Sequence, residues 1–99
     1  MSDRFQIIKQ DELEKALSKI SEWSLKDNGL YREFKFKNFI EALAFITKIG
    51  IYAEKLNHHP EIFNVYNKVI ISGLCTHDAD NAITTLDIEL AQQISKLKE

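Results

Sequence analysis

The chain has 99 residues, of which 44% are hydrophobic and 28% are charged, and this size predicts one domain covering residues 1–99. With 13 basic and 15 acidic residues the formal net charge is -2, which excludes a broad positive field for nucleic acid or an anionic membrane. The single cysteine, Cys75, rules out an internal disulfide, and no signal peptide or long apolar run is found, so we expect a cytoplasmic protein, with the nucleus as a second location.

The first part of the chain predicts a helix followed by a β-hairpin. Apolar residues recur at helical spacing over residues 11–21, where Asp11 and Glu14 fit a capping box. Apolar and polar residues then alternate from Trp23 onward on both sides of Asn28-Gly29. Since both residues of this pair tolerate positive φ, the pair predicts a type I′ turn between two strands.

A second, longer helix is predicted for residues 39–56, with Asn38 as its N-cap. Its apolar residues occupy more than one side, which is typical of a helix that packs on a sheet and on a partner subunit. Asn57 suits the end of this helix, and Pro60 stops the helix and holds His59 in an extended backbone. The pair His58-His59 therefore falls at the junction of a helix and a strand.

The last part predicts a second hairpin and a final helix. Asn67-Lys68 is the expected turn, and residues 69–75 form the return strand, in which Gly73 indicates a bulge. Thr84 and Asp87 then fit a capping box for the last helix. The order α-β-β-α-β-β-α predicts an α+β fold, with a four-stranded antiparallel sheet and the helices packed on one face. An uncovered edge strand of such a sheet would favour pairing with a second copy.

The three histidines of the chain are expected to converge at one end of this sheet. His58 and His59 precede the second hairpin and His77 follows it, and a hairpin brings its outer ends together. Three imidazoles suit a zinc site or proton transfer near neutral pH. Adjacent residues in an extended segment point to opposite sides, which disfavours chelation of one ion by His58 and His59, so we expect no metal site. Simple solvation of the pair is the remaining alternative.

The neighbouring polar residues each have a plain structural interpretation. Asp87 reads as the acid of a capping box and Glu54 as an exposed helix carboxylate. Asp78 is placed to fix the tautomer of His77 or to cap the loop, while Cys75 and Thr76 are most simply strand-end residues.

A resemblance to a known family rests on two motifs and one acidic residue. The sequence is similar to pterin-4a-carbinolamine dehydratases in Glu54-x-x-x-His58-His59-Pro60-Glu61-x-Phe63-Asn64-Val65-Tyr66-Asn67-x-Val69, in Leu74-x-Thr76-His77-Asp78 and in Asp87. These residues lie within residues 54–87, and the order of helices and strands is similar over nearly all of the chain.

This resemblance implies an enzyme that dehydrates 4a-hydroxytetrahydropterins to quinonoid dihydropterins, without a metal or an organic cofactor. The reaction regenerates the tetrahydrobiopterin cofactor of aromatic amino acid hydroxylases. Family members form homodimers by joining their sheets and homotetramers by joining their helices. Some also act as dimerisation cofactors for a homeodomain transcription factor, which is the alternative, non-catalytic function.

The resemblance also implies roles for individual residues. His58 and His77 would transfer protons, and His59 would bind and orient the pterin. The pterin contacts would come from Asn57, Pro60, Cys75, Thr76 and Asp78 together with the three histidines, and Glu54 and Asp87 would support the rings.

Two departures from the family pattern affect His77. The strand before it has one extra residue, which would reverse the facing of everything that follows unless a bulge at Gly73 absorbs it. The loop after His77 reads "DADNAI" where the family usually has a glycine pair, and Asn81 is expected to take a left-handed conformation there.

Overall fold

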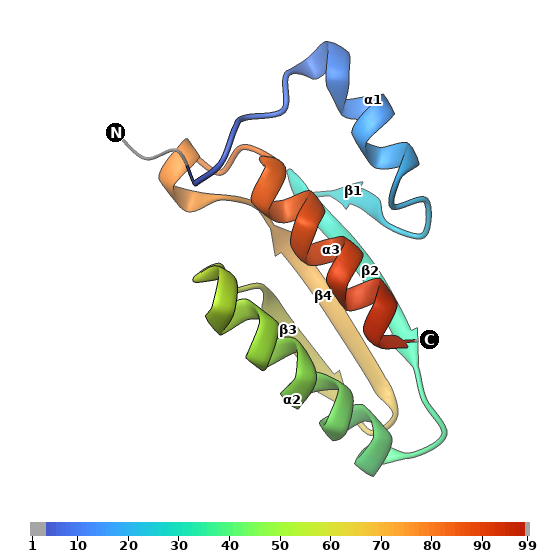
Figure 1. Cartoon of the computed structure of the whole chain (residues 1–99). Coiled ribbons are helices and arrows are strands. Elements are labelled where there is room, and N and C mark those ends of the chain that lie inside the picture. Colours follow the sequence, from blue (N-terminus) through green and yellow to red (C-terminus); the bar gives the residue numbers. More distant parts are fainter. Residues whose placement is uncertain (1–3, 99) are drawn as a thin grey trace.

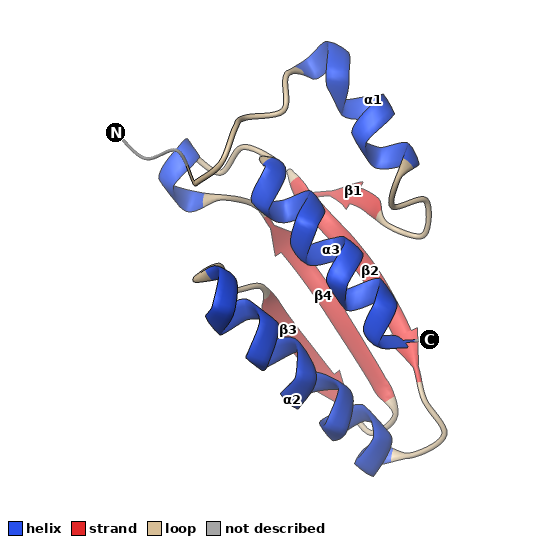
Figure 2. Cartoon of the chain, viewed as in Figure 1, coloured by secondary structure: helices blue, strands red, loops and turns tan. Residues whose placement is uncertain are grey.

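The computed structural model describes residues 4–98, and its elements follow the expected order (Figures 1 and 2). These elements are α1 Gln10–Ser18, β1 Ser24–Lys26, β2 Gly29–Lys35, α2 Phe39–Leu56, β3 Glu61–Val65, β4 Lys68–Leu74, the short 3₁₀ helix η1 His77–Ala79, and α3 Thr85–Lys98. All neighbouring strands are antiparallel, in the order β1-β2-β4-β3. The predicted α+β fold with a four-stranded antiparallel sheet is therefore confirmed.

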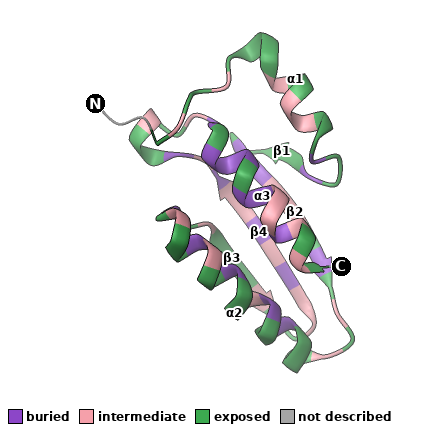
Figure 3. Cartoon of the chain, in the orientation of Figure 1, coloured by how far each residue is buried: buried purple, intermediate pink, exposed green. Residues whose placement is uncertain are grey.

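The core lies between the sheet and the pair of long helices. Figure 1 shows α2 and α3 side by side over one face of the sheet, with α1 near β1. Figure 3 shows that α2 and α3 carry buried residues along the sides that face the sheet. Phe34 on β2 and Phe45 on α2 have ring centroids 4.8 Å apart, and the Trp23 ring meets Phe34 edge-on at 6.1 Å. None of the helices in the described part of the chain is long and apolar enough to cross a bilayer.

The first helix begins earlier and ends earlier than predicted. Its N-cap is Lys9, and the backbone N–H of Lys9 donates to the Glu12 carboxylate, so the expected cap at Asp11 was wrong. Beyond Ser18 the chain continues in tight turns, in which the Ile20 N–H donates to the Leu17 carbonyl. These turns bury Ile20, which a continued helix was expected to carry.

Both hairpin turns lie one residue before their predicted positions. In the first hairpin Lys26 pairs with Gly29, so Asp27 and Asn28 form the turn, with φ values of 53° and 66°. In the second hairpin Val65 pairs with Lys68, which makes Tyr66 and Asn67 the turn residues. In both hairpins the pairing register therefore places the turn one residue earlier than the turn propensities predict.

The backbone of β2 at Gly29 lies so close to the backbone of β4 at Gly73 that no side chain fits at position 29. A Cβ atom at Gly29 would lie 2.5 Å from the Gly73 Cα atom and 2.6 Å from its carbonyl carbon. Real Cβ atoms do not approach backbone atoms so closely, and neither strand can shift without disturbing its pairing. The glycine therefore permits the close contact of β2 with β4.

Gly29→Ala is expected to lower the free energy of unfolding by about 1–3 kcal/mol, because the methyl group overpacks two backbones. Urea denaturation followed by the fluorescence of the single tryptophan would measure this change. Gly50→Ala is the matched control, since a Cβ atom there meets nothing within 4 Å and alanine should stabilise α2 by up to about 1 kcal/mol. Equal stability of Gly29→Ala and the unmodified chain would contradict the role of this contact.

The predicted bulge at Gly73 is present. Leu30 pairs with Leu74 and Arg32 pairs with Ile71, so Ser72 and Gly73 on β4 lie opposite the single residue Tyr31. Gly73 has a φ of +57°, which suits a glycine at a bulge. Ile71 and Leu74 are consequently both buried, although three positions separate them. The bulge thus absorbs the extra residue of this strand.

Candidate active site

A cavity of about 260 Å³ lies where α2 ends and where the chain leaves β4. Its walls come from the junction after α2, from the segment that includes η1, and from the N-terminal segment. The lining residues are Arg4, Asn57, His58, His59, Cys75, Thr76, His77 and Asp78. The expected convergence of the three histidines is therefore found. Of the predicted pterin contacts only Pro60 is missing from the lining, and Arg4 was not predicted.

The end of α2 directs the two adjacent histidines. Asn57 ends the helix as predicted, and its φ of 50° and ψ of 46° give it the left-handed conformation. The His58 N–H donates to the Ala53 carbonyl at 3.0 Å and the Asn57 N–H donates to the Glu54 carbonyl at 3.1 Å, which together form a Schellman motif. After this turn His58 is buried and His59 is exposed.

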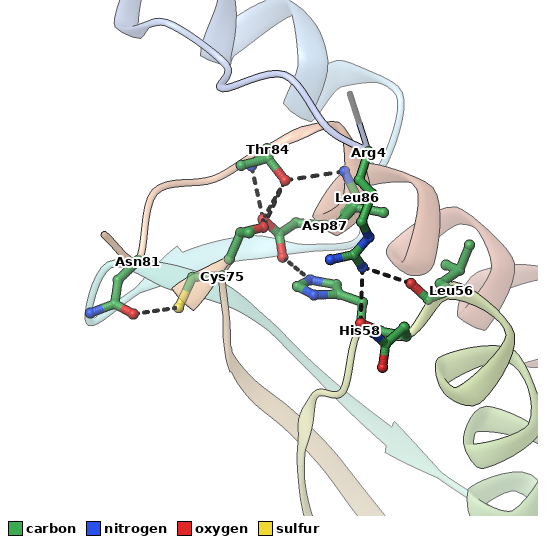
Figure 4. A network of polar contacts seen from close by, with 10 residues as sticks. Arg4, Leu56, His58, Cys75, Asn81, Thr84, Leu86 and Asp87 are labelled. Atoms are coloured by element: carbon green, nitrogen blue, oxygen red, sulfur yellow. Dashed lines mark hydrogen bonds and ion pairs between the residues drawn. The ribbon is translucent and has the colours of Figure 1, made fainter. Parts of the chain in front are cut away.

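The His58 ring bonds to a buried carboxylate (Figure 4). Its Nε2 atom lies 2.6 Å from Asp87 Oδ1, and the two residues are only 8% and 0% exposed. A carboxylate that accepts from Nε2 places the ring proton on that nitrogen, so Nδ1 is the nitrogen that is able to take up a proton. The pair thus holds His58 in one orientation and one tautomer.

Asp87 has a structural role as well. Its Oδ2 atom accepts from the Thr84 N–H and from the Thr76 hydroxyl, each at 2.8 Å. Thr84 Oγ1 is 2.7 Å from Thr76 Oγ1 and accepts from the Leu86 N–H at 3.2 Å. One half of the predicted capping box at the start of α3 is present, since Asp87 accepts from the Thr84 N–H, whereas the Thr84 hydroxyl accepts from the Leu86 N–H rather than from that of Asp87. The same carboxylate also bonds to His58.

The second histidine of the pair bonds to a carboxylate in solvent. His59 Nε2 lies 2.5 Å from Glu54 Oε1, and these side chains are 54% and 80% exposed. An exposed pair of this kind adds about 1 kcal/mol or less to stability. Its effect is to orient the His59 ring at the rim of the cavity, on a carboxylate different from the partner of His58.

His77 is exposed and belongs to η1, which forms another side of the cavity. The loop after η1 folds back, because the Thr76 N–H donates to the Ala82 carbonyl and the Asn81 N–H donates to the Thr76 carbonyl, both at 3.0 Å. Asp80 and Asn81 have φ values of 54° and 65°, which confirms the left-handed conformation predicted for Asn81. The altered loop therefore leaves His77 at the cavity.

Cys75 lines the cavity as a protonated thiol rather than as a nucleophilic thiolate. Burial raises the pKa of the Cys75 thiol, and the carboxylates of Asp87 and Glu61 raise this pKa further. A raised pKa keeps the group protonated near neutral pH, and the thiolate is the nucleophilic form. Within residues 4–98, no group of three or more histidine, cysteine, aspartate or glutamate side chains is placed to hold a metal ion.

Arg4 is the lining residue that the sequence did not reveal. It lies more than 50 positions before the other lining residues, in a segment without a recognisable motif. Its guanidinium reaches the end of α2, where Nη2 donates to the carbonyls of Leu56 and Asn57, both at 2.9 Å. Only the folded chain brings this cation to the histidines.

Comparisons with known proteins agree with this geometry. The family model described as Pterin 4 alpha carbinolamine dehydratase matches residues 6–97. Two similar curated proteins carry the name pterin-4-alpha-carbinolamine dehydratase. One, from Prochlorococcus marinus, is 50% identical over 92% of this chain and 93% of its own length, and one from Rhizobium johnstonii is 48% identical over 85% and 83%.

A solved structure has the same fold. The crystal structure of a transcriptional coactivator/pterin dehydratase from Brucella melitensis superposes with a TM-score of 0.87 and is 38% identical. The match covers 95% of this chain and all of that one. A match of the family model over nearly the whole chain, together with relatives of about 50% identity, establishes the family. The chain belongs to the pterin-4a-carbinolamine dehydratases, a family of lyases.

Proposed function

We propose that this chain catalyses the dehydration of a 4a-hydroxytetrahydropterin to a quinonoid dihydropterin in tetrahydrobiopterin recycling. The observation that carries the proposal is the bond of 2.6 Å between His58 and the buried Asp87, in a cavity that His59 and His77 also line. This reaction needs one group to accept a proton and another to donate one, and paired imidazoles suit both tasks near neutral pH.

In the proposed reaction the proton on pterin N5 leaves, the C4a–N5 bond becomes double, and the C4a–O bond breaks. His58 accepts the N5 proton at Nδ1, because Asp87 occupies Nε2 and stabilises the imidazolium that forms. His77, at the exposed side of the cavity, gives a proton to the departing hydroxyl, which leaves as water. His59, oriented by Glu54, binds and aligns the flat ring. No metal or organic cofactor takes part.

The test is a stopped-flow measurement of 4a-hydroxytetrahydropterin decay with and without the protein. We expect the protein to accelerate the decay well beyond the spontaneous rate in the same buffer, since each proton transfer typically contributes about 10²- to 10⁴-fold. Decay at the spontaneous rate in the presence of folded protein would refute the dehydratase function.

We also propose that the chain forms a homodimer or a homotetramer. The strand β3 lies at one edge of the sheet, and Phe63 on it is 55% exposed. Four apolar residues of α2, Phe39, Ile40, Leu43 and Ile51, are exposed too, and Ile40 reaches 76%. Apolar surface of this kind is typical of interfaces between subunits. Sedimentation velocity should therefore give a multiple of the 11.5 kDa chain mass, and a monomer at micromolar concentration would refute this assembly.

The alternative function is that of a dimerisation cofactor for a transcription factor. It is favoured by the Brucella melitensis structure, which is of a transcriptional coactivator/pterin dehydratase, and by the exposed apolar face of α2. Sedimentation with a purified candidate transcription factor distinguishes the two. A mixed complex that replaces the homo-oligomer, without dehydratase activity, would favour the alternative.

A further inference from the structure

The N-terminal segment joins the two parts of the chain that carry His58 and Asp87. The Ile8 N–H donates to the Ile83 carbonyl and the Thr85 N–H donates to the Gln6 carbonyl, both at 3.0 Å. The Gln6 N–H donates to the Thr85 hydroxyl at 3.1 Å. Residues 6–8 are thus fixed beside residues 83–85, which lie two to four positions before Asp87. Arg4 extends from this fixed segment toward the end of α2, as Figure 4 shows.

Arg4 donates hydrogen bonds to backbone carbonyls at the end of α2 that the helix itself does not use. The Schellman motif uses the carbonyls of Ala53 and Glu54. The Arg4 Nη2 group donates to two carbonyls outside that motif, those of Leu56 and Asn57. A cation at a helix C-terminus also interacts favourably with the helix dipole. The peptide units on both sides of Asn57, immediately before His58, are thereby tied to the N-terminal segment.

We infer that Arg4 is a positioning residue for His58, an inference that rests on the proposed dehydratase function. His58 and Asp87 come from elements 29 positions apart. The His58 ring and the Asp87 carboxylate are joined by one direct bond. They are also connected through the N-terminal segment, because Arg4 bonds to Asn57 and residues 6–8 bond to residues 83–85. Arg4 holds the left-handed turn at Asn57, and the turn aims the imidazole at Asp87. Misplacement of a reacting group by about 1 Å can cost about 10²-fold in rate.

The test compares Arg4→Ala and Arg4→Lys with Lys9→Ala in the full chain. Lys9 is an exposed cation of the same N-terminal segment outside the cavity, so its removal controls for charge. In Arg4→Ala we expect kcat to fall about 10- to 100-fold with KM within about twofold, because a lost alignment acts on the transition state. Arg4→Lys should recover part of kcat, since an ammonium also donates to carbonyls, and Lys9→Ala should match the unmodified protein.

A second readout does not depend on activity. The proton that His58 Nε2 shares with Asp87 should give a protected, downfield NMR signal from the imidazole, and Arg4→Ala should broaden or remove it while the melting temperature stays close to that of Lys9→Ala. If the unmodified chain has no dehydratase activity but Arg4→Ala still loses this signal, the proposed function is refuted and the positioning role is supported. An unchanged signal and kcat in Arg4→Ala would overturn the inference, as would a rise in KM alone, which would make Arg4 a substrate contact.

Discussion

Asp87→Ala is expected to remove both stability and dehydratase activity. The substitution leaves two buried donors, the Thr84 N–H and the His58 ring N–H, without their acceptor. The Thr76 hydroxyl also loses Asp87, although it can turn to Thr84 Oγ1 at 2.7 Å. A buried donor without a partner costs about 1–3 kcal/mol, so we expect the free energy of unfolding to fall by about 3–5 kcal/mol. Turnover should fall about 10²- to 10⁴-fold in the molecules that remain folded, because His58 loses its orientation.

Urea denaturation, followed by the fluorescence of buried Trp23, measures the stability, and the stopped-flow assay measures the turnover. Glu89→Ala is the matched control, because Glu89 is an exposed carboxylate two positions further along α3. Asp87→Asn keeps the side-chain size but replaces one acceptor oxygen with a donor, so an intermediate loss is expected. Asp87→Ala with unaltered unfolding would show that the buried network does not stabilise the fold.

His58→Gln is expected to remove activity while it preserves the fold. The glutamine amide can still donate a hydrogen bond to Asp87, so the buried carboxylate keeps a partner and the stability should change by about 1 kcal/mol or less. Glutamine cannot take up the N5 proton, so kcat should fall about 10²- to 10⁴-fold. The contrast with Asp87→Ala separates the catalytic function of the pair from its structural function.

The other two histidines provide the comparison. His77→Gln should lower kcat in the same way as His58→Gln, since it removes the proposed proton donor. His59→Gln should chiefly raise KM, because its ring is proposed to bind the pterin at the rim of the cavity. Full activity of His58→Gln in the stopped-flow assay would contradict the assignment of His58 as the base.

The sequence predicted the elements that depend on local pattern. Helical spacing located α2. Its end at Asn57 and the bond of Asp87 to the Thr84 N–H followed from residue types with known local geometry. The bulge at Gly73 followed from a glycine inside a strand. Features that a few consecutive residues determine could therefore be predicted.

The features that depended on contacts between distant residues were misplaced or missed. Gly29 was assigned to a turn because it follows an asparagine, but its contact is with Gly73 on another strand. The second turn moved for a related reason, since the register with β4 pairs Val65 with Lys68. Arg4 was missed because its partners, the carbonyls of Leu56 and Asn57, are backbone atoms that no side-chain pattern marks.

The dual attachment of Asp87 bears on how relatives of this chain should be sorted into enzymes and non-enzymes. The carboxylate accepts hydrogen bonds from Thr76 and from the start of α3 whether or not a histidine faces it. A relative that serves only as a binding partner would therefore still gain stability from an acid at this position. Retention of this aspartate is thus a weak marker of catalysis. A relative that has lost the histidine corresponding to His58 but retains the aspartate is the one expected to have lost catalysis while it retains the fold.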